Sequence, residues 1–121
     1  MSQQGTQGMS SLPRIKALQQ KYNDYQQTLT DIATKMRELQ RDEEEHSIVI
    51  GTLQKTPKER RCFRMVGGAL VEKTAGETLP VLEVKLENIG KTVKQLAEEH
   101  GRLVEEFEKW KTDNKIQIIK Q

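Results

Sequence analysis

Residues 61–74 read RCFRMVGGALVEKT, and this stretch decides the fold that the sequence predicts. Two short runs, RCFRMV and ALVEKT, are rich in residues that favour β-strands, and the dipeptide Gly67-Gly68 separates them. A two-residue glycine turn permits positive φ at both positions, as a tight hairpin turn requires. The stretch therefore predicts a β-hairpin.

Side chains alternate between the faces of a strand, so both faces of this hairpin are expected to carry apolar groups. One face would hold Phe63, Met65 and Leu70, and the other Cys62, Arg64, Val66, Ala69 and Val71. A two-stranded hairpin is marginally stable in water and leaves two open edges. We therefore predict subunit assembly through the hairpin, by Phe63, Met65, Val66, Gly67, Gly68, Leu70 and Val71. The alternative is a hairpin that packs onto helices of its own chain.

The segment before the hairpin predicts a coiled-coil helix over residues 13–54. From Ile15 to Leu53 its seam residues recur at spacings of three and four in one heptad register, and all are apolar except the pair Glu43 and His46. Pro13 suits the first turn of a helix, and Pro57 disfavours helical backbone at the residue before it. A polar connector then leads to the hairpin.

The segment after the hairpin predicts a second coiled-coil helix over residues 75–115. Thr74 and Glu77 have the spacing of a capping box, in which each residue satisfies a backbone amide of the other. Pro80 follows closely and leaves Thr78 as an alternative start. An apolar series with the same three-four spacing then continues without a break.

Because a short hairpin joins them, the two helices are expected to fold back on one another. The predicted fold class is α-dominated with one β-hairpin: a long antiparallel two-helix coiled coil with the hairpin at its bend. Leu53 would then lie near Leu79, and Tyr22 near Trp110. We expect a flexible head over residues 1–12 and a single domain over residues 13–121.

The two ends of the chain would meet at the far tip of such a coiled coil. Residues 115–121, KIQIIKQ, keep no heptad pattern, so a two-helix seam cannot take up all their isoleucines. The tip, with residues 116–121 at its end, is therefore predicted to bind a partner. The predicted contacts are Leu12, Ile15, Leu18, Trp110, Ile116, Ile118 and Ile119. The alternative is an apolar plug that holds the tip closed.

Composition excludes several classes of protein. Only 34% of the 121 residues are hydrophobic and 4% aromatic, too few for an ordinary globular core. The 20 basic and 18 acidic residues are interspersed, which makes a nucleic-acid-binding coiled coil a poor alternative. A single cysteine, with no apolar leader and no run of 18 apolar residues, predicts a soluble, intracellular protein.

No pattern in the sequence points to catalysis. His46 and His100 fall in the predicted seams, far apart and without neighbouring cysteines, so we expect no metal site. Cys62 has no neighbouring histidine to act as a base. With no glycine-rich phosphate loop either, the sequence predicts a protein that is not an enzyme and takes no cofactor.

Three stretches together carry a resemblance to a known family. Residues 45–53 (EHSIVIGTL), the hairpin, and the opening of the second helix at Leu79, Pro80 and Leu82 closely resemble prefoldin subunits of the β class. The similarity covers about residues 15 to 120. The Met-Val-Gly-Gly turn is its specific part, whereas coiled coils occur in many unrelated proteins. Members of the β class carry one hairpin and those of the α class two, in agreement with the single hairpin here.

The resemblance implies a heterohexamer of two α-class and four β-class subunits, in which hairpins join into intersubunit β-barrels. The coiled-coil tips would hold unfolded proteins, such as actin and tubulin, and pass them without ATP to the cytosolic group II chaperonin. The resemblance implies a cytoplasmic location and leaves a nuclear pool open. Neither nucleic acid nor membrane is expected as a partner. The alternative function is a coiled-coil scaffold or tether without chaperone activity, which would not need surplus apolar residues at its tip.

Overall fold

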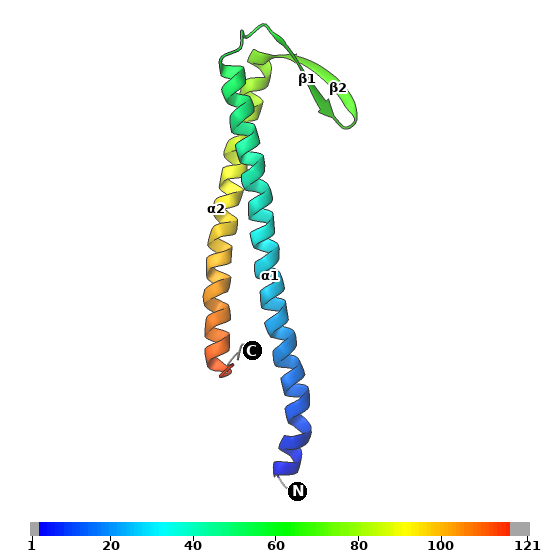
Figure 1. Ribbon diagram of the computed structural model, residues 1–121, viewed down its shortest axis with the longest axis vertical. Helices are drawn as coiled ribbons and strands as arrows, with labels where there is room; N and C mark the ends of the chain where they lie inside the picture. The colour runs from blue at the N-terminus through cyan, green and yellow to red at the C-terminus, as the bar shows by residue number, and fades with distance from the viewer. Residues whose placement is uncertain (1–2, 117–121) are drawn as a thin grey trace, which may run out of the picture. The chain divides into compact units, whose positions relative to one another are not determined.

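The computed structural model describes residues 3–116, with side chains from residue 11 onward. Four elements follow one another along the chain: helix α1 (Gln3–Gln54), strands β1 (Arg61–Val66) and β2 (Ala69–Thr74), and helix α2 (Ala75–Asp113) (Figure 1). Two long helices with an antiparallel hairpin between them confirm the predicted fold class. Neither helix has a stretch long and apolar enough to cross a membrane within the described residues.

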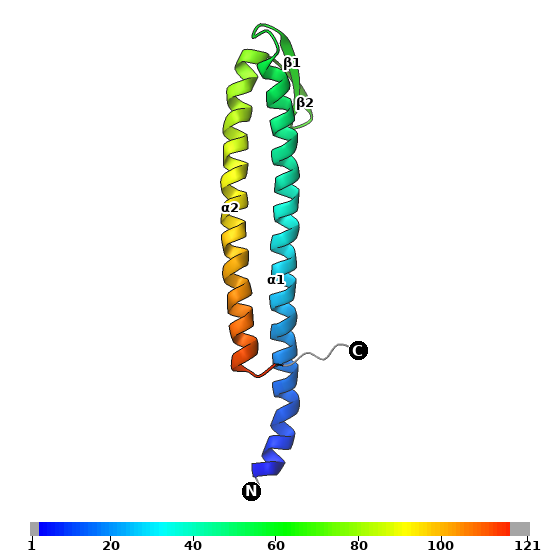
Figure 2. The same ribbon diagram turned by 60° about the vertical axis from the view of Figure 1, so that its left-hand side comes forward.

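The chain divides into two compact units. The first contains residues 1–34 and 98–121, and the second contains residues 35–97, including the hairpin. Within each unit a part of α1 lies beside a part of α2 (Figure 2). The single domain predicted over residues 13–121 stays a prediction.

Helix α1 begins ten residues before its predicted start. It includes Pro13, whose missing amide hydrogen leaves the carbonyl of Met9 without its usual helical partner. The fixed φ of proline is nevertheless close to the helical value, and the lost hydrogen bond is a local cost. Residues 3–12, predicted as a flexible head, therefore continue the helix that Arg14 and the residues after it form.

The predicted seams are covered in both units. From Leu18 to Leu53 in α1 and from Leu79 to Trp110 in α2, each seam side chain is buried or half-buried. Ile32 and Ile50 are the most buried seam residues of α1. The heptad pattern thus buries one apolar stripe of each helix, although polar residues outnumber apolar ones.

Contacts within each unit run in the antiparallel sense. In the first unit the ring of Tyr22 contacts Phe107 and that of Tyr25 contacts Trp110, so the start of α1 faces the end of α2. In the second unit Leu53 and Leu79 line the same small pocket, as predicted. Tyr22 and Trp110, expected to lie near one another, both contact Phe107 in the first unit.

Backbone hydrogen bonds tie the connector to the start of α2. The amide of Ala75 donates to the carbonyl of Arg60 at 2.8 Å, and that of Gly76 donates to the carbonyl of Lys58 at 3.0 Å. A Cβ atom at Gly76 would lie 3.3 Å from the Cβ of Lys58, so the close approach favours glycine there. These contacts hold the base of the hairpin at one position on the helix.

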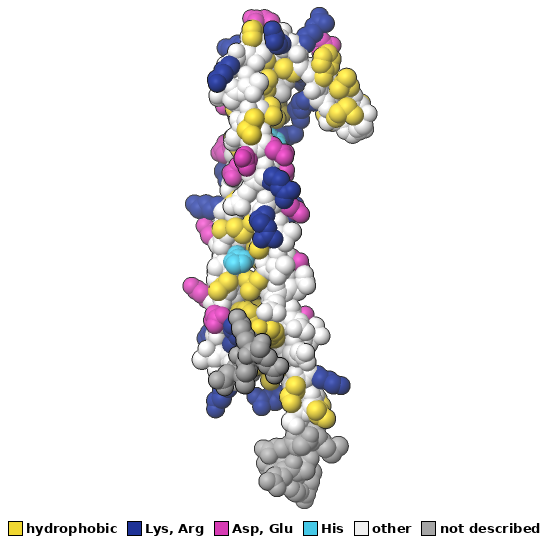
Figure 3. All heavy atoms as spheres, viewed as in Figure 1, with side chains coloured by type: hydrophobic (Ala, Val, Ile, Leu, Met, Phe, Trp, Pro, Cys, Tyr) yellow, Lys and Arg dark blue, Asp and Glu magenta, His cyan; other side chains and the backbone are white. Residues whose placement is uncertain are grey.

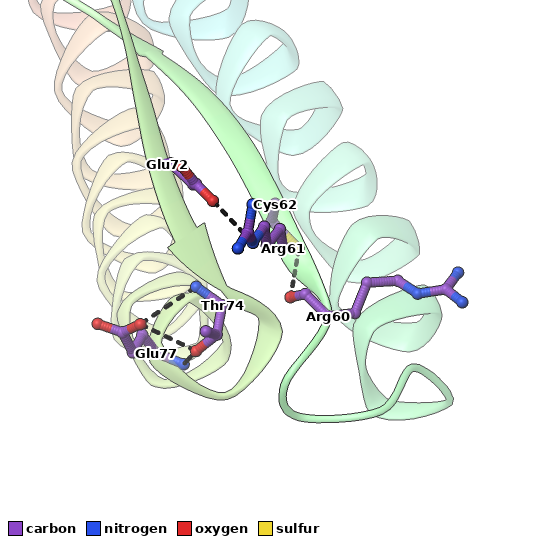
Figure 4. A network of polar contacts seen from close by, with 6 residues as sticks. All are labelled: Arg60, Arg61, Cys62, Glu72, Thr74 and Glu77. Carbon is purple, nitrogen blue, oxygen red and sulfur yellow. Dashed lines mark hydrogen bonds and ion pairs between the residues drawn. The ribbon is translucent and has the colours of Figure 1, made fainter.

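The predicted capping box is present at the start of α2 (Figure 4). The amide of Glu77 donates to Oγ1 of Thr74 at 3.2 Å, and the amide of Thr74 donates to Oε1 of Glu77 at 3.2 Å. The hydroxyl of Thr74 also donates to that carboxylate, at 3.0 Å. Helix α2 accordingly begins at Ala75, and Pro80 lies inside it rather than moving the start to Thr78.

The capping box predicts a pH-dependent contribution to stability. Hydrogen bonds from the backbone and then the side chain of Thr74, with a smaller effect of Lys73, lower the pKa of Glu77. A lowered pKa in the folded state means that the charged carboxylate stabilises the fold above its unfolded pKa. This contribution should disappear as the pH falls through the folded pKa.

We therefore expect Glu77→Gln to lower the melting temperature at pH 7, and the difference from the wild type to vanish in acid. Thermal unfolding followed by circular dichroism between pH 7 and pH 3 would measure it. Glu98→Gln is the control, because it makes the same change at an exposed position of α2 outside the capping box. Equal effects of the two substitutions at pH 7, or a difference that persists in acid, would contradict the expectation.

Candidate functional site

The hairpin has the predicted register and turn. Met65 pairs with Leu70 and Phe63 with Glu72, on either side of a two-residue turn. Gly67 and Gly68 have φ values of 54° and 82°, a backbone region that residues other than glycine rarely adopt. Glycine at both positions therefore permits the tight turn that sets the pairing.

One face of the hairpin is apolar and open to solvent. Phe63 is 60% exposed, Met65 69% and Leu70 63%, and the register places the three on the same face. On the opposite face Cys62, Arg64 and Val71 are half-buried, whereas Val66 near the turn is 51% exposed. Figure 3 shows hydrophobic side chains gathered on the hairpin. We call Phe63, Met65 and Leu70 the open hairpin face.

The edges of the hairpin are open as well. Within residues 3–116 the sheet consists of β1 and β2, so each strand has a side without a hydrogen-bonded neighbour. An ion pair of 3.1 Å between Nε of Arg61 and Oε1 of Glu72 lies near the base, where both side chains are largely exposed (Figure 4). Exposed strand edges beside an apolar face can accept strands from another chain.

The second candidate site is at the end of α2 in the first unit, next to a cluster of four aromatic rings. Phe107 is 7% exposed, and its ring centroid lies 5.2 Å from that of Tyr22 and 4.9 Å from that of Tyr25. Trp110 lies 5.5 Å from Tyr25 and 6.1 Å from Phe107. Nζ of Lys111 lies 4.5 Å from the centroid of the Phe107 ring, in cation–π geometry.

A left-handed turn after α2 returns the chain toward α1. Lys115 has φ of 54°, and the amide of Ile116 donates to the carbonyl of Lys111 at 2.8 Å. The amide of Lys115 donates to the carbonyl of Thr112 at 3.1 Å. This pair of hydrogen bonds forms a Schellman motif, which ends the helix and directs Ile116 back over it.

Ile116 then lines an apolar groove on α1. The groove has a volume of about 430 Å³ and is lined by Ile15, Leu18, Gln19, Tyr22, Asn23 and Ile116. Ile15 is 56% exposed at its edge, although it belongs to the predicted seam. We call this feature the tip groove.

The structure brings together only some of the predicted tip residues. Ile15, Leu18 and Ile116 share the tip groove. Trp110 is half-buried in the aromatic cluster instead, and Leu12 is exposed one turn before Ile15. Ile118 and Ile119 lie outside the described residues. A client-binding role of all seven stays a prediction.

Two features of this end were missed by sequence reasoning. The first is the packing of three rings around Phe107, which depends on the exact offset between the helices. The second is a set of cations beside the groove: Arg14 and Lys16 flank Ile15, and Lys115 precedes Ile116. The whole-chain charge of +2 hides this local excess, which a residue-by-residue charge profile would have revealed.

His46 and Cys62, two of the residues considered for metal binding or nucleophilic chemistry, take part in local hydrogen bonds. Nδ1 of His46 lies 2.8 Å from the carbonyl of Asp42, one turn earlier in α1. The thiol of Cys62 lies 3.8 Å from the carbonyl of Arg60. Among the residues described, His, Cys, Asp and Glu side chains form no group of three or more that could hold a metal ion.

Comparison with known proteins identifies the family to which this architecture belongs. The family model described as prefoldin subunit matches residues 16–121. The chain belongs to the prefoldin subunit family. Prefoldin subunits are chaperone components that assemble with other prefoldin subunits and are not enzymes. The chain is thus a prefoldin co-chaperone subunit.

Relatives from several eukaryotes agree with this assignment. The chain is 49% identical to prefoldin subunit 2 of Saccharomyces cerevisiae over 107 residues, which cover 88% of this chain and 96% of the relative. It is 41% identical to the probable prefoldin subunit 2 of Schizosaccharomyces pombe, over 89% of this chain and 95% of that one. The human prefoldin subunit 2 is 36% identical, over 81% of this chain and 64% of its own length.

A solved structure shares the prefoldin fold. The crystal structure of the prefoldin beta subunit from Thermococcus strain KS-1 matches with a TM-score of 0.70, over 84% of this chain and 89% of that one. The two sequences are only 19% identical, so the match concerns the fold. It includes the arrangement that sequence reasoning predicted, two long helices joined through a hairpin.

Proposed function

We propose that this chain is a β-class subunit of a prefoldin heterohexamer, built from two α-class and four β-class subunits. Its hairpin joins hairpins of neighbouring subunits in a β-barrel. The observation that carries this proposal is the open hairpin face, where three large apolar side chains share one side of a sheet whose two edges are free of other strands within residues 3–116. Strands from neighbours would cover both the face and the edges.

The tips of the coiled coils hold unfolded proteins such as actin and tubulin and deliver them, without ATP, to the cytosolic group II chaperonin. The tip groove and the exposed Ile15 support this part, because unfolded chains present apolar segments. Several weak sites on one assembly gain affinity together while each contact stays reversible. The complex would act in the cytoplasm, with a nuclear pool left open.

Assembly can be tested by mixing the chain with α-class subunits. Alone, the chain should be helical but poorly defined in oligomeric state, because its hairpin lacks partners; with α-class subunits it should give a discrete hexamer. Native mass spectrometry and far-UV circular dichroism would report both properties. A stable, closed monomer that does not assemble with α-class subunits would contradict the proposal.

Client holding at the tip predicts a separate effect. Changing Ile116, Ile118 and Ile119 to serine, or ending the chain after Asn114, should leave the hexamer intact and weaken its capture of a denatured client. The loss should stay below about tenfold, because the tips of the other subunits still bind. Light scattering of a diluted, unfolded client would measure protection, and native mass spectrometry would measure assembly.

The matched control changes three exposed residues of the second unit, Ile48, Val49 and Val84, to serine. These side chains are apolar but lie outside the tip, so client protection should remain at the wild-type level. If a hexamer with all six tips trimmed protects the client as well as the wild type, client binding lies elsewhere.

A further inference from the structure

The tip groove is apolar, but the surface around it is strongly basic. Residues 11–23 and 109–116 contain six basic side chains, Arg14, Lys16, Lys21, Lys109, Lys111 and Lys115. The same stretches contain one acidic side chain, Asp113, which pairs with Lys109 at 2.9 Å; Asp24 and Glu108 directly adjoin them. Figure 3 shows Lys and Arg side chains around this end of the helices.

Three of these cations flank the apolar residues at the mouth of the groove. Arg14 and Lys16 neighbour Ile15 in the helix, so they project about 100° to either side of it. Lys115 directly precedes Ile116 across the groove. All three are exposed, and among the ion pairs of residues 11–116 none involves them.

The other cations at this end are already engaged. Lys111 pairs with Glu108 at 2.8 Å while it lies over the Phe107 ring, and Lys109 pairs with Asp113. Nζ of Lys21 lies 5.8 Å from the centroid of the Tyr25 ring. The neighbouring part of α2, residues 98–108, carries five glutamates against one arginine. The basic surface is therefore confined to the surroundings of the groove and is not a general property of the first unit.

We propose that the tip groove selects client segments in which apolar residues are flanked by acidic ones. An apolar segment would displace water from Ile15, Leu18 and Ile116, and its carboxylates would meet Arg14, Lys16 and Lys115. Segments flanked by lysine would be disfavoured by the same charges. This inference rests on the proposed function, because it names the class of client that the tip holds.

The test uses the assembled complex and a reporter on this chain alone. Gln19, a polar residue of the groove wall, is replaced by a photo-crosslinking benzoylphenylalanine. Three labelled peptides share one apolar core of leucine, isoleucine and phenylalanine, and carry aspartate, asparagine or lysine on both sides. Crosslinking as a function of peptide concentration then measures occupancy of this groove, at 0.1 M and at 1 M salt.

We expect the aspartate peptide to bind about fivefold more tightly than the asparagine peptide, and the lysine peptide more weakly than both. High salt should reduce the difference, because the Debye length falls from about 10 Å to about 3 Å. The difference in affinity between the peptides should disappear in the triple variant Arg14→Gln/Lys16→Gln/Lys115→Gln. That difference should remain in the control variant Lys35→Gln/Lys85→Gln/Lys94→Gln, which loses the same charge in the second unit.

The failures of the two proposals are distinguishable. Equal crosslinking of the three peptides would overturn selection by charge and leave client holding at the tip intact. Crosslinking of none of them, or crosslinks from Gln19 to the chain itself that no peptide displaces, would overturn client binding at this groove. A charge preference that survives in the triple variant at the tip would also overturn the assignment to Arg14, Lys16 and Lys115.

Discussion

Replacing Phe63 and Leu70 with aspartate is expected to abolish assembly of the prefoldin complex while leaving the helix content of the chain nearly unchanged. Both side chains are exposed on the open hairpin face, so the substitutions cost the isolated chain little. In an interface each would have contributed about 2 kcal/mol, which together corresponds to roughly a thousandfold in affinity. Burying two carboxylates among apolar strands would add a further cost.

Native mass spectrometry of the variant with its partner subunits would measure the loss of hexamer, and far-UV circular dichroism would measure helix content. Val84→Asp/Val104→Asp is the matched control, because it adds the same two charges at exposed apolar positions of α2. This control should assemble. If the hairpin variant still forms hexamer, or if the control loses it equally, the hairpin is not the element that directs assembly.

Replacing Phe107 with alanine is expected to lower the free energy of unfolding by about 3 kcal/mol or more. Its ring is the most buried aromatic ring described and contacts Tyr22, Tyr25 and Trp110, so its removal leaves a cavity at the centre of the cluster. The residue lies in the first unit and the hairpin in the second. Assembly with partner subunits should therefore persist.

Thermal unfolding of the full chain would give the overall loss, and hydrogen exchange would locate it in residues 11–34 and 98–116. The control, Val104→Ala, removes an exposed side chain from the same turns of α2 and should cost under about 1 kcal/mol. Equal losses in the two variants would mean that the aromatic cluster does not hold the helices together.

Much of the fold could be predicted because its signals are local. Gly67 and Gly68 confine the hairpin to a two-residue turn, and counting outward from it gives every strand pair through Arg61 and Thr74. The spacing of Thr74 and Glu77 places the start of α2 at Ala75. The start of α1 was the exception, because the cost of Pro13 within a helix depends on how strongly its neighbours favour helix.

The candidate sites were predicted less completely. The faces of the hairpin could be predicted because side chains alternate between the two faces of a strand. The observed register puts Phe63, Met65 and Leu70 on one face as expected. At the tip, the sequence identified surplus apolar residues without showing which of them share a surface. Ile116 reaches the groove with Ile15 and Leu18 only because Lys115 adopts a left-handed conformation, which its residue type does not favour.

The sequence by itself determined the hairpin, the helix cap and the heptad seams, because each depends on residues within one or two turns of one another. Only the tertiary structure decided how the seams align and what they leave exposed. The contact of Tyr22 with Phe107 depends on the axial offset between two helices, and residue spacing within one helix carries no information about that offset. The open hairpin face was decided in the same way, since exposure depends on what else packs nearby.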